Sequence, residues 1–489
     1  MSASKENMVI LGAAESGVGT AILAKKLGMQ VFVSDFGKIA DKYKAELEKY
    51  QIQFEEGQHS QEIILAADVL VKSPGIPDKA PIIKKLKEAN IQIQSEIEFA
   101  SKHTTAKIIA ITGTNGKTTT TLLTHHLLGK AGFNVGLGGN IGKSFARQVA
   151  EESHDYYVLE LSSFQLDGCY TFRADIAVLT NITPDHLDRY EYNLQNYIES
   201  KFRIIQNQRS EDVFIYCADD ALTLQQLEKI TPAMQCFPFS IKKKENMSAW
   251  LEDTQLNIQT HNQTYNMSIH DLALQGKHNI YNSMAAGIAG RILDIRKEVV
   301  RESFSDFENI EHRLENVTTV HGIEFINDSK ATNVNSTWYA LESMQKPTIW
   351  IAGGVDKGNE YEMLLELVKK RVKAIVCMGT ENKKIIEAFK SVVPIIIETA
   401  SAEEAVQAAY GLGKNGDVVL LSPACFLPTP LYPRATLKVL ITLPCLQIFK
   451  ICFEVCTLIP FDKGHVAVLA NKMTGKKVTI IKVIAFIFI

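Results

Sequence analysis

Residues 108–120 read Ile-Ile-Ala-Ile-Thr-Gly-Thr-Asn-Gly-Lys-Thr-Thr-Thr, and this stretch decides the fold of the chain. Its β-branched apolar start is typical of a buried parallel strand, and the apolar spacing after Thr120 is typical of a helix. Backbone N–H groups at such a junction bind phosphate, Lys117 would reach the outer phosphates, and Thr118 would hold Mg²⁺. Ile111 stands where the standard phosphate loop has its first glycine, so the loop is a shortened variant. A purely structural turn is the alternative.

Composition limits the class of protein. The chain has 489 residues, of which 46% are hydrophobic and 22% charged, and its net charge is −3. These values predict about three globular domains and no nucleic-acid partner. The N-terminus does not resemble a signal peptide, and no apolar run is long enough to span a membrane. The eight cysteines form no CxxC pair, which favours a reduced cytoplasmic chain. We expect a cytoplasmic monomer.

Residues 1–105 are predicted to form a nucleotide-binding domain. A strand at 8–11 runs into a glycine-containing turn and a helix, and a second strand ends at Asp35. This βαβ opening would hold a diphosphate at the helix start, with Asp35 near a ribose or base edge. The glycine spacing supports NAD only weakly, and a tight packing turn with a solvated Asp35 is the alternative. A further strand runs into a turn at Gly75, where open α/β sheets bind ligands.

Residues 106–310 add charged groups to the edge where the phosphate loop lies. Glu160 ends an apolar strand, and a buried strand rarely keeps an unpaired carboxylate, so a metal ion beside the phosphates would satisfy it. His186 follows the next strand and Lys201 lies further on in a helical stretch. Clustered at one sheet edge, these side chains predict a polyphosphate and Mg²⁺ site. The alternatives are a Glu160 paired with a core cation, a capped loop histidine and a solvated lysine.

Three other features of this segment carry weaker signals. Residues 136–142 are predicted to form a glycine-rich loop that carries Asn140. Short alternating runs between residues 236 and 274 predict a small antiparallel meander. Asn279 opens a helix, where its amide could read an adenine edge. Helix capping is the favoured interpretation of Asn279 without further context.

Residues 311–425 are predicted to form a third parallel α/β unit, because apolar strands alternate with helical stretches. Three of the predicted strands end near Lys330, Lys357 and Ser422. Cations at strand ends fit a substrate that carries carboxylates. For any one of these lysines, a solvated loop position is an equally good interpretation.

Together these motifs resemble the Mur ligase family, and the resemblance runs in order and spacing through about residues 5–425. The segments that carry it are 12–19, 111–119, 160–165, 181–186, 276–279, 328–333, 353–358 and 422–425. It implies three α/β domains, each on a mainly parallel sheet: a Rossmann-like N-terminal domain, a P-loop-type central domain and a Rossmann-like C-terminal domain. It also implies an ATP-dependent enzyme that joins D-glutamate to the L-alanine carboxylate of UDP-N-acetylmuramoyl-L-alanine in peptidoglycan precursor synthesis, and thus serves cell shape and division.

The resemblance assigns an expected role to each matching position. The residues expected at ATP are Gly113, Thr114, Asn115, Gly116, Lys117, Thr118, Thr119, Asn279, Arg313 and Asp328. Those expected at the UDP substrate are Ser16, Gly17, Asp35, Gly75, Asn140 and His186. Those expected at D-glutamate are Lys330, Thr332, Lys357 and Ser422. Magnesium would be held by Thr118, Glu160, His186 and a carbamylated Lys201, and Lys117, Glu160, His186 and Lys201 would be catalytic.

The sequence leaves the family pattern after Cys425. Residues 426–489 are apolar and carry eight Lys or Arg against two acidic residues, a net charge of +6, which leaves −9 for the rest of the chain. A motif that stops abruptly where the composition changes suggests a translational frameshift, and a genuine extension is the alternative. An exposed apolar tail of this kind would favour aggregation.

Two other functional classes stay open at this point. The first is a degenerate ligase that binds nucleotide without catalysis, although the presence of Lys117, Glu160, His186 and Lys201 argues against it. The second is another ATP-dependent amino-acid ligase, either a sister Mur ligase or a folylpolyglutamate synthase. Residues 328–333 and the UDP-type N-terminal domain disfavour this second alternative.

Overall fold

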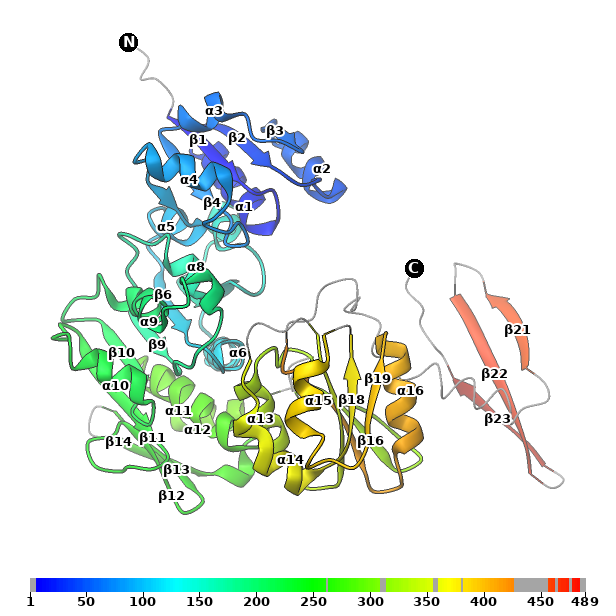
Figure 1. Cartoon of the computed structure of the whole chain (residues 1–489). Helices are drawn as coiled ribbons and strands as arrows, with labels where there is room; N and C mark the ends of the chain where they lie inside the picture. The colour runs from blue at the N-terminus through cyan, green and yellow to red at the C-terminus, as the bar shows by residue number, and fades with distance from the viewer. Residues whose placement is uncertain are drawn as a thin grey trace, which may run out of the picture. The chain divides into compact units, whose positions relative to one another are not determined.

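The computed structural model in Figure 1 describes residues 6–260, 263–307, 314–354, 359–379, 381–425, 456–461, 465–474 and 477–483. The chain divides into two compact units, residues 1–309 and 310–489. Arg313 and Lys357, two of the predicted site residues, lie outside the described residues. Among the residues described, no helix has both the length and the apolar character needed to cross a bilayer.

The first unit begins with a parallel five-stranded sheet in the order β3-β2-β1-β4-β5. Its strands are β1 (Asn7–Leu11), β2 (Gln30–Asp35), β3 (Gln53–Glu56), β4 (Val69–Lys72) and β5 (Ile93–Gln94). Its helices are α1 (Glu15–Lys26), α2 (Asp41–Lys49), α3 (Gln61–Leu65), α4 (Pro81–Glu88) and α5 (Glu96–Ser101). The strands alternate with helices because the apolar runs are short and helical spacing follows each one.

A nine-stranded sheet follows in the same unit, in the order β14-β13-β12-β11-β10-β9-β6-β8-β7. Its strands are β6 (Lys107–Thr112), β7 (Val135–Gly139), β8 (Tyr156–Glu160), β9 (Ile176–Leu179), β10 (Val213–Cys217), β11 (Gln235–Ser240), β12 (Ala249–Glu252), β13 (Gln255–Thr260) and β14 (Gln263–Ser268). Strands β6 and β8–β11 form the parallel centre, and β12 to β14 form the antiparallel meander that the sequence predicts.

Helices connect and flank these strands. They are α6 (Lys117–Lys130), α7 (Phe145–Glu151), α8 (Ser163–Leu166), α9 (Leu194–Phe202), α10 (Ala221–Leu227), α11 (Lys277–Ile292) and α12 (Lys297–Ser305), with short 3₁₀ turns η1 (Leu187–Arg189), η2 (Arg203–Ile205) and η3 (Ile269–Asp271). The central parallel strands have apolar, buried interiors; in β6, for example, Ile109, Ala110 and Ile111 are at most 1% exposed. A strand that is covered on both faces of its sheet has apolar residues at successive positions, instead of alternating apolar and polar residues.

The glycine-rich loop predicted at residues 136–142 is partly wrong, because Val135–Gly139 forms the edge strand β7. Its glycines make room for neighbouring side chains. A Cβ on Gly136 would lie 2.6 Å from the Tyr157 ring, and one on Gly138 would lie 2.9 Å from Gln148 Nε2. Close packing therefore explains the glycines at positions 136 and 138, and a loop conformation is not needed to explain them.

The second unit contains a six-stranded sheet in the order β15-β16-β20-β17-β18-β19. Its strands are β15 (Glu315–Val320), β16 (Ile323–Asn327), β17 (Thr348–Ala352), β18 (Val372–Met378), β19 (Ile396–Thr399) and β20 (Val418–Leu421). Its helices are α13 (Val334–Ser343), α14 (Leu365–Arg371), α15 (Lys383–Phe389) and α16 (Ala402–Leu412), with the 3₁₀ turn η4 (Glu362–Leu364). Only β15 is antiparallel within this sheet. The predicted class, three α/β domains on mainly parallel sheets, is confirmed.

Three strands lie beyond Cys425. They are β21 (Cys456–Phe461), β22 (His465–Thr474) and β23 (Lys477–Val483), and they pair as an antiparallel sheet in that order. The sequence interpretation assigned no strands to this segment. Its origin in a frameshift stays a prediction.

Candidate active site

The phosphate loop connects β6 to α6 in a conformation that requires its glycines. Gly113 and Gly116 have φ values of 145° and 84°. A Cβ on Gly113 would lie 1.9 Å from Thr180 Oγ1, and one on Gly116 would lie 2.4 Å from Asn282 Oδ1. Both positions therefore combine a left-handed backbone with close packing, which only glycine accepts without strain.

Neighbouring residues fix part of this loop. The backbone N–H of Thr114 donates to the Asn181 carbonyl at 2.8 Å, and that of Asn115 donates to Asn181 Oδ1 at 3.0 Å. The N-cap residue of α6 is Gly116, which has no side chain to cap the helix. The first N–H groups of a helix lack intrahelical acceptors, so those of Lys117, Thr118 and Thr119 are placed to bind an anion. This local structure fits a phosphate site, and phosphate binding by these residues stays a prediction.

Lys117 lies folded across its own loop. Its Nζ donates to the carbonyls of Gly113 at 2.9 Å and Thr114 at 2.8 Å. A lysine in this position carries its charge beside the helix start, where phosphates would bind. Turning outward to reach the outer phosphates would exchange two contacts with neutral carbonyl oxygens for ion pairs with phosphate oxygens.

Glu160 ends β8 beside the phosphate loop, because β6 and β8 pair in register with Ile111 opposite Glu160. Its side chain is 2% exposed, and its Oε1 accepts a hydrogen bond from Asn140 Nδ2 at 2.8 Å. The other oxygen, Oε2, is buried and makes no hydrogen bond. A buried carboxylate oxygen without a donor fits a divalent cation, since hard cations prefer such ligands.

No three His, Cys, Asp or Glu side chains converge on one metal position within the described part of the chain. A cation at Glu160 would thus need further ligands of another kind. The hydroxyl of Thr118, which is 6% exposed at the start of α6, and the phosphates themselves would supply oxygen atoms. The donor set fits Mg²⁺ bound together with a nucleotide.

Lys201 lies in α9 and is 1% exposed. Its Nζ donates to the Gly113 carbonyl at 2.7 Å and lies 4.6 Å from the centroid of the Tyr197 ring. Burial lowers the pKa of Lys201 well below its usual value, and the charge of Lys117 lowers it further against the opposing carboxylates. The fully solvated lysine considered from the sequence is therefore excluded.

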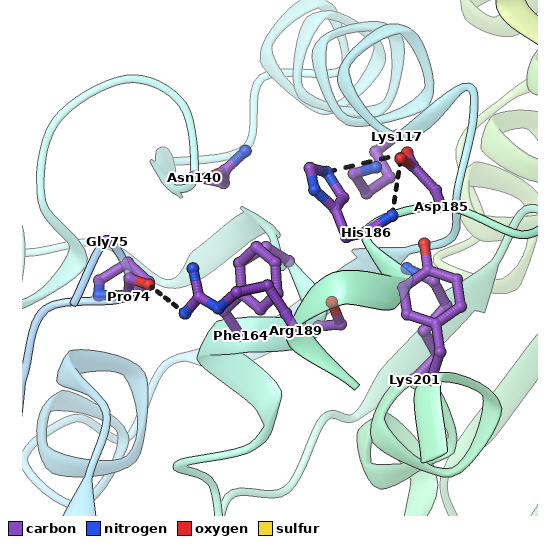
Figure 2. A pocket seen from close by; sticks show the side chains of 12 residues that line it. Pro74, Gly75, Lys117, Asn140, Phe164, Asp185, His186, Arg189 and Lys201 are labelled. Carbon is purple, nitrogen blue, oxygen red and sulfur yellow. Dashed lines mark hydrogen bonds and ion pairs between the residues drawn. The ribbon is translucent and has the colours of Figure 1, made fainter. Parts of the chain in front are cut away.

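His186 has left-handed backbone with φ of 52° and precedes the turn η1. Its N–H donates to Asp185 Oδ1 at 2.9 Å, and its Nε2 lies 3.8 Å from Asp185 Oδ2. The ring packs edge-on against Phe164, with centroids 5.3 Å apart. These contacts hold the imidazole at the carboxyl edge of the sheet, near Lys117 (Figure 2).

A cavity of about 300 Å³ brings several of these side chains together (Figure 2). Its lining residues are Pro74, Gly75, Lys117, Asn140, Ser162, Ser163, Phe164, Asp185, His186, Arg189, Tyr197 and Lys201. The predicted residues Gly75, Asn140, Lys117, His186 and Lys201 thus share one space. Asp185, Arg189 and Tyr197 were not predicted as site residues, although Asp185 lies in the motif at 181–186 and Arg189 follows it.

Asn279 lies in the first turn of α11, and its amide is engaged within that region. Nδ2 donates to the Gln275 carbonyl at 2.9 Å, and Oδ1 accepts from Asn282 Nδ2 at 3.1 Å. Asn282 Oδ1 in turn accepts from Thr120 Oγ1 at 3.2 Å. A contact of Asn279 with adenine stays a prediction. Asn282 lies between α11 and the phosphate loop, since a Cβ on Gly116 would meet its Oδ1.

The predicted diphosphate turn of the first sheet is closely packed. A Cβ on Gly17 would lie 1.9 Å from the Gly12 carbonyl oxygen, so this position also requires glycine. Asp35 is not simply solvated: Oδ2 accepts from the Ala13 N–H at 2.7 Å and Oδ1 from the Gly37 N–H at 2.8 Å. Ser16 is half-buried in the first turn of α1. Asp35 therefore stabilises the turn through two backbone N–H groups. Its contact with a ribose stays a prediction.

In the second unit, two predicted residues meet because β16 and β20 are parallel neighbours that end together. Ser422 Oγ donates to Asp328 Oδ2 at 3.0 Å and lies at the same distance from Thr337 Oγ1. Both Asp328 and Ser422 are buried. Lys330 is exposed, and its carbonyl accepts from the Thr332 N–H at 3.0 Å. The four predicted residues described in this unit thus lie within one strand-end region or directly after it.

Comparison with known proteins places the chain in a family. Residues 7–82 match the MurD N-terminal domain, residues 111–290 the Mur ligase middle domain, and residues 312–425 the Mur ligase glutamate ligase domain. The chain is 56% identical over 420 residues to the UDP-N-acetylmuramoylalanine–D-glutamate ligase of Christiangramia forsetii, a match that covers 86% of this chain and 94% of that protein. The chain belongs to the Mur ligase family.

Other Mur ligases agree with this assignment. Proteins with the same name from Bacteroides fragilis and Porphyromonas gingivalis are 55% and 51% identical over 421 and 423 residues, covering 86% of this chain and 95% and 94% of theirs. The solved structure of UDP-N-acetylmuramate–alanine ligase MurC from Thermotoga maritima has a TM-score of 0.58 at 18% identity, with 91% of this chain and 99% of that chain covered. Mur ligases are ATP-dependent, and the MurF ligase of Thermotoga maritima was solved in complex with ADP (TM-score 0.55, 15% identity, 90% of this chain and 94% of that chain).

Proposed function

We propose that this Mur ligase joins D-glutamate to the L-alanine carboxylate of UDP-N-acetylmuramoyl-L-alanine, with ATP hydrolysed to ADP and phosphate. The observation that carries the proposal is the single cavity shared by Lys117, His186, Lys201 and Asn140 beside the phosphate loop. Relatives of this name that are 50% or more identical over 86% of the chain support the choice of substrates. The degenerate ligase and the folylpolyglutamate synthase are not favoured.

A carboxylate is a poor electrophile, so the reaction needs activation. A carboxylate oxygen attacks the γ-phosphorus of ATP, the bond to the β-bridging oxygen breaks, and ADP leaves. The amine of D-glutamate then attacks the acyl carbon of the resulting acyl phosphate, and the tetrahedral intermediate collapses with loss of phosphate and a proton. The chain's own contribution is to position the reactants and neutralise their charge, as in other phosphoryl transfers.

Each predicted residue has a part in this proposal. The amides of residues 113–119 and the Lys117 ammonium bind the ATP phosphates, while Asn279, Arg313 and Asp328 bind the nucleoside. Ser16, Gly17, Asp35, Gly75, Asn140 and His186 bind the UDP substrate. Lys330, Thr332, Lys357 and Ser422 bind D-glutamate. Glu160 and Thr118 would hold one Mg²⁺, and His186 with Lys201 a second, which would neutralise charge on the transferring phosphoryl oxygens.

Lys201 would act as a carbamate in this proposal. The neutral amine is the form that adds to CO₂, and burial favours that form because it lowers the pKa of Lys201. Addition forms an N–C bond, releases one proton and converts the side chain into a carboxylate-like oxygen ligand. The location of this reaction would be the cytoplasm, with the enzyme a monomer that binds no nucleic acid.

The experiment that tests the proposal is phosphate and ADP release from the full chain with UDP-N-acetylmuramoyl-L-alanine and a panel of amino acids. We expect release that depends on D-glutamate, and a product whose mass equals that of the nucleotide precursor joined to glutamate. Equal release with L-glutamate, or release without any amino acid, would contradict the substrate assignment. Lys117→Ala serves as the inactive control.

A further inference from the structure

Arg189 is a cation without a carboxylate partner at the cavity. It ends the turn η1, is half-buried, and makes no ion pair with any residue that the structure describes. Its guanidinium carbon lies 4.4 Å from the centroid of the Phe164 ring. Stacking of this kind fixes the guanidinium plane and leaves its in-plane N–H donors available.

The remaining contacts of Arg189 are weak. Its Nη2 lies 3.5 Å from the Pro74 carbonyl and 3.4 Å from the Ile76 carbonyl, both at the long limit of hydrogen bonding. The Ile76 carbonyl already accepts a shorter hydrogen bond of 2.8 Å from Lys72 Nζ. These two long contacts satisfy little of the five-donor capacity of an arginine.

Asp78, an acid that pairs with Lys72 beside the Ile76 carbonyl, is engaged by two lysines. Asp78 accepts from Lys87 Nζ at 2.7 Å and forms an ion pair with Lys72 at 3.4 Å. The charge of Arg189 is one of the causes that lower the pKa of Lys72, after burial and against the attraction of Asp78. Asp167, which also acts on the pKa of Lys72, accepts a hydrogen bond from the Tyr190 hydroxyl at 2.9 Å. Among the described residues, neither Asp78 nor Asp167 forms an ion pair with Arg189.

The position of Arg189 indicates which part of a substrate it would meet. Figure 2 shows it beside Pro74 and Gly75, on the opposite side of the cavity from Lys117 and Lys201. The loop at Gly75 also packs against the diphosphate turn of the first sheet, because a Cβ on Gly12 would lie 2.6 Å from Ser73 Oγ. Arg189 thus lies on the side of the cavity that faces the nucleotide-binding sheet.

We propose that Arg189 is a binding residue for the nucleotide-sugar substrate and donates hydrogen bonds to a phosphoryl oxygen of its diphosphate. The inference rests on the proposed function and deepens it. The fork of N–H donors suits a phosphate, and stacking on Phe164 holds the fork ready. The diphosphate is unchanged by the reaction, so Arg189 stabilises substrate and transition state equally and acts on affinity, not on the chemical step.

The test compares Arg189→Gln, Arg189→Lys and the wild-type chain in the binding of UDP-N-acetylmuramoyl-L-alanine by calorimetry. We expect Kd and KM for this ligand to rise about 10- to 100-fold in Arg189→Gln, the range for a hydrogen bond to a charged group. The kcat, and KM for ATP and D-glutamate, should change less than about twofold. Arg189→Lys keeps the charge but not the fork and should recover part of the loss.

Two controls keep the inference falsifiable. Arg173→Gln removes an arginine that is paired with Asp212 instead, and it should leave the affinity for the nucleotide sugar unchanged. The carboxamide analogue, UDP-N-acetylmuramoyl-L-alaninamide, keeps the diphosphate but lacks the carboxylate. Arg189→Gln should weaken binding of the analogue and of the substrate by the same factor. If only the substrate loses affinity, Arg189 binds the carboxylate and the inference is wrong.

Failure of this inference is distinguishable from failure of the proposed function. Equal Kd values for the wild-type chain and Arg189→Gln would overturn the role of Arg189 while leaving the ligase activity in place. If the wild-type chain neither binds the nucleotide sugar nor releases phosphate with D-glutamate, the proposed function itself is wrong. Thermal unfolding of each variant, compared with wild type, separates lost binding from lost folding.

Discussion

Replacing Glu96 by glutamine should remove a large pH dependence from the stability of the junction between the first and second sheets. Glu96 begins α5 and is 3% exposed. Its Oε1 accepts from Ser144 Oγ at 2.5 Å and from the Ala146 N–H at 3.0 Å, whereas Oε2 is buried without a hydrogen bond. Burial raises the pKa of Glu96 from 4.5 to about 7, although these two donors act against the shift.

The direction of the effect follows from proton binding. Between about pH 4.5 and 7 the folded chain keeps the Glu96 proton and the unfolded chain releases it. Stability linked to Glu96 is therefore fully present below pH 4.5 and is lost as the pH rises through about 7. A shift of this size corresponds to about 3 kcal/mol at 1.36 kcal/mol per pKa unit. Glutamine keeps an acceptor oxygen for Ser144 and Ala146 but does not titrate.

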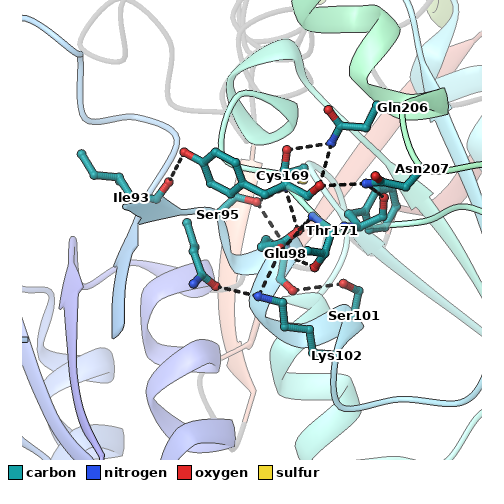
Figure 3. Close-up of polar contacts among 12 residues, drawn as sticks. Ile93, Ser95, Glu98, Ser101, Lys102, Cys169, Thr171, Gln206 and Asn207 are labelled. Atoms are coloured by element: carbon teal, nitrogen blue, oxygen red, sulfur yellow. Dashed lines mark hydrogen bonds and ion pairs between the residues drawn. The ribbon is translucent and has the colours of Figure 1, made fainter. Parts of the chain in front are cut away.

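Glu98, two residues along α5, is the matched control because its shift has the opposite sign. Figure 3 shows its carboxylate facing the segment that contains Thr171, and it accepts from the N–H groups of Tyr170 at 3.0 Å and Phe172 at 2.9 Å. Burial alone raises its pKa, but hydrogen bonds from Thr171, Lys102 and these amides outweigh burial and lower it. Its contribution is present above pH 4.5 and is lost as the pH falls through the lowered pKa.

Native-state hydrogen exchange at the amides of Ala146 and Thr171 measures these effects in the full chain, since it reports local opening without requiring all domains to unfold together. In wild type we expect the opening free energy at Ala146 to fall by about 2 to 3 kcal/mol between pH 5 and 8. Glu96→Gln should abolish that fall, and Glu98→Gln should destabilise Thr171 more at pH 8 than at pH 4. Parallel pH profiles for wild type and Glu96→Gln would refute the reasoning.

Three further outcomes follow from the phosphate loop and its surroundings. Lys117→Ala should release no ADP in the coupled assay while its melting temperature stays near that of wild type, and normal turnover would contradict its role. Gly116→Ala should cost about 1 to 3 kcal/mol in thermal unfolding, because its φ is 84° and the new Cβ would meet Asn282 Oδ1 at 2.4 Å; an unchanged melting temperature would exclude that contact. Glu160→Gln should lower activity at least about tenfold and raise the Mg²⁺ concentration needed for half-maximal rate, and an unaltered Mg²⁺ titration would remove Glu160 from the metal site.

The sequence could predict those parts of the site that follow from strand order. Parallel strands end at the same edge, so residues directly after them meet. Glu160 therefore lies beside the phosphate loop, and Ser422 lies beside Asp328. The burial of Lys201 next to the Gly113 carbonyl was not predicted, since a lysine in a helical stretch is equally typical of a solvated position.

Other parts could not be predicted, because they depend on packing between segments far apart in the chain. Asn282 reaches the phosphate loop from a helix more than 150 residues later, and nothing in its local pattern marks it. Arg189 follows a recognised motif, but its unpaired charge is visible only when Phe164 and the Pro74 carbonyl are placed around it. The glycines of β7 resemble a loop in sequence, since the side chains that need the space come from Tyr157 and Gln148.

Lys117 and Lys201 both contact the phosphate loop, and the charge of Lys117 affects the pKa of Lys201. The activity of a Lys117 variant must therefore be interpreted together with the state of Lys201. The charge of Lys117 helps to lower the pKa of Lys201, so its removal acts against carbamate formation as well as against phosphate binding. Burial is the larger cause of the lowered pKa, and Lys201 is 1% exposed in the wild-type chain. Burial therefore continues to favour the neutral amine of Lys201 in Lys117→Ala. A Lys117→Ala chain that still incorporates ¹³C-labelled CO₂ at Lys201, yet makes no product, would assign the loss of activity to phosphate binding alone.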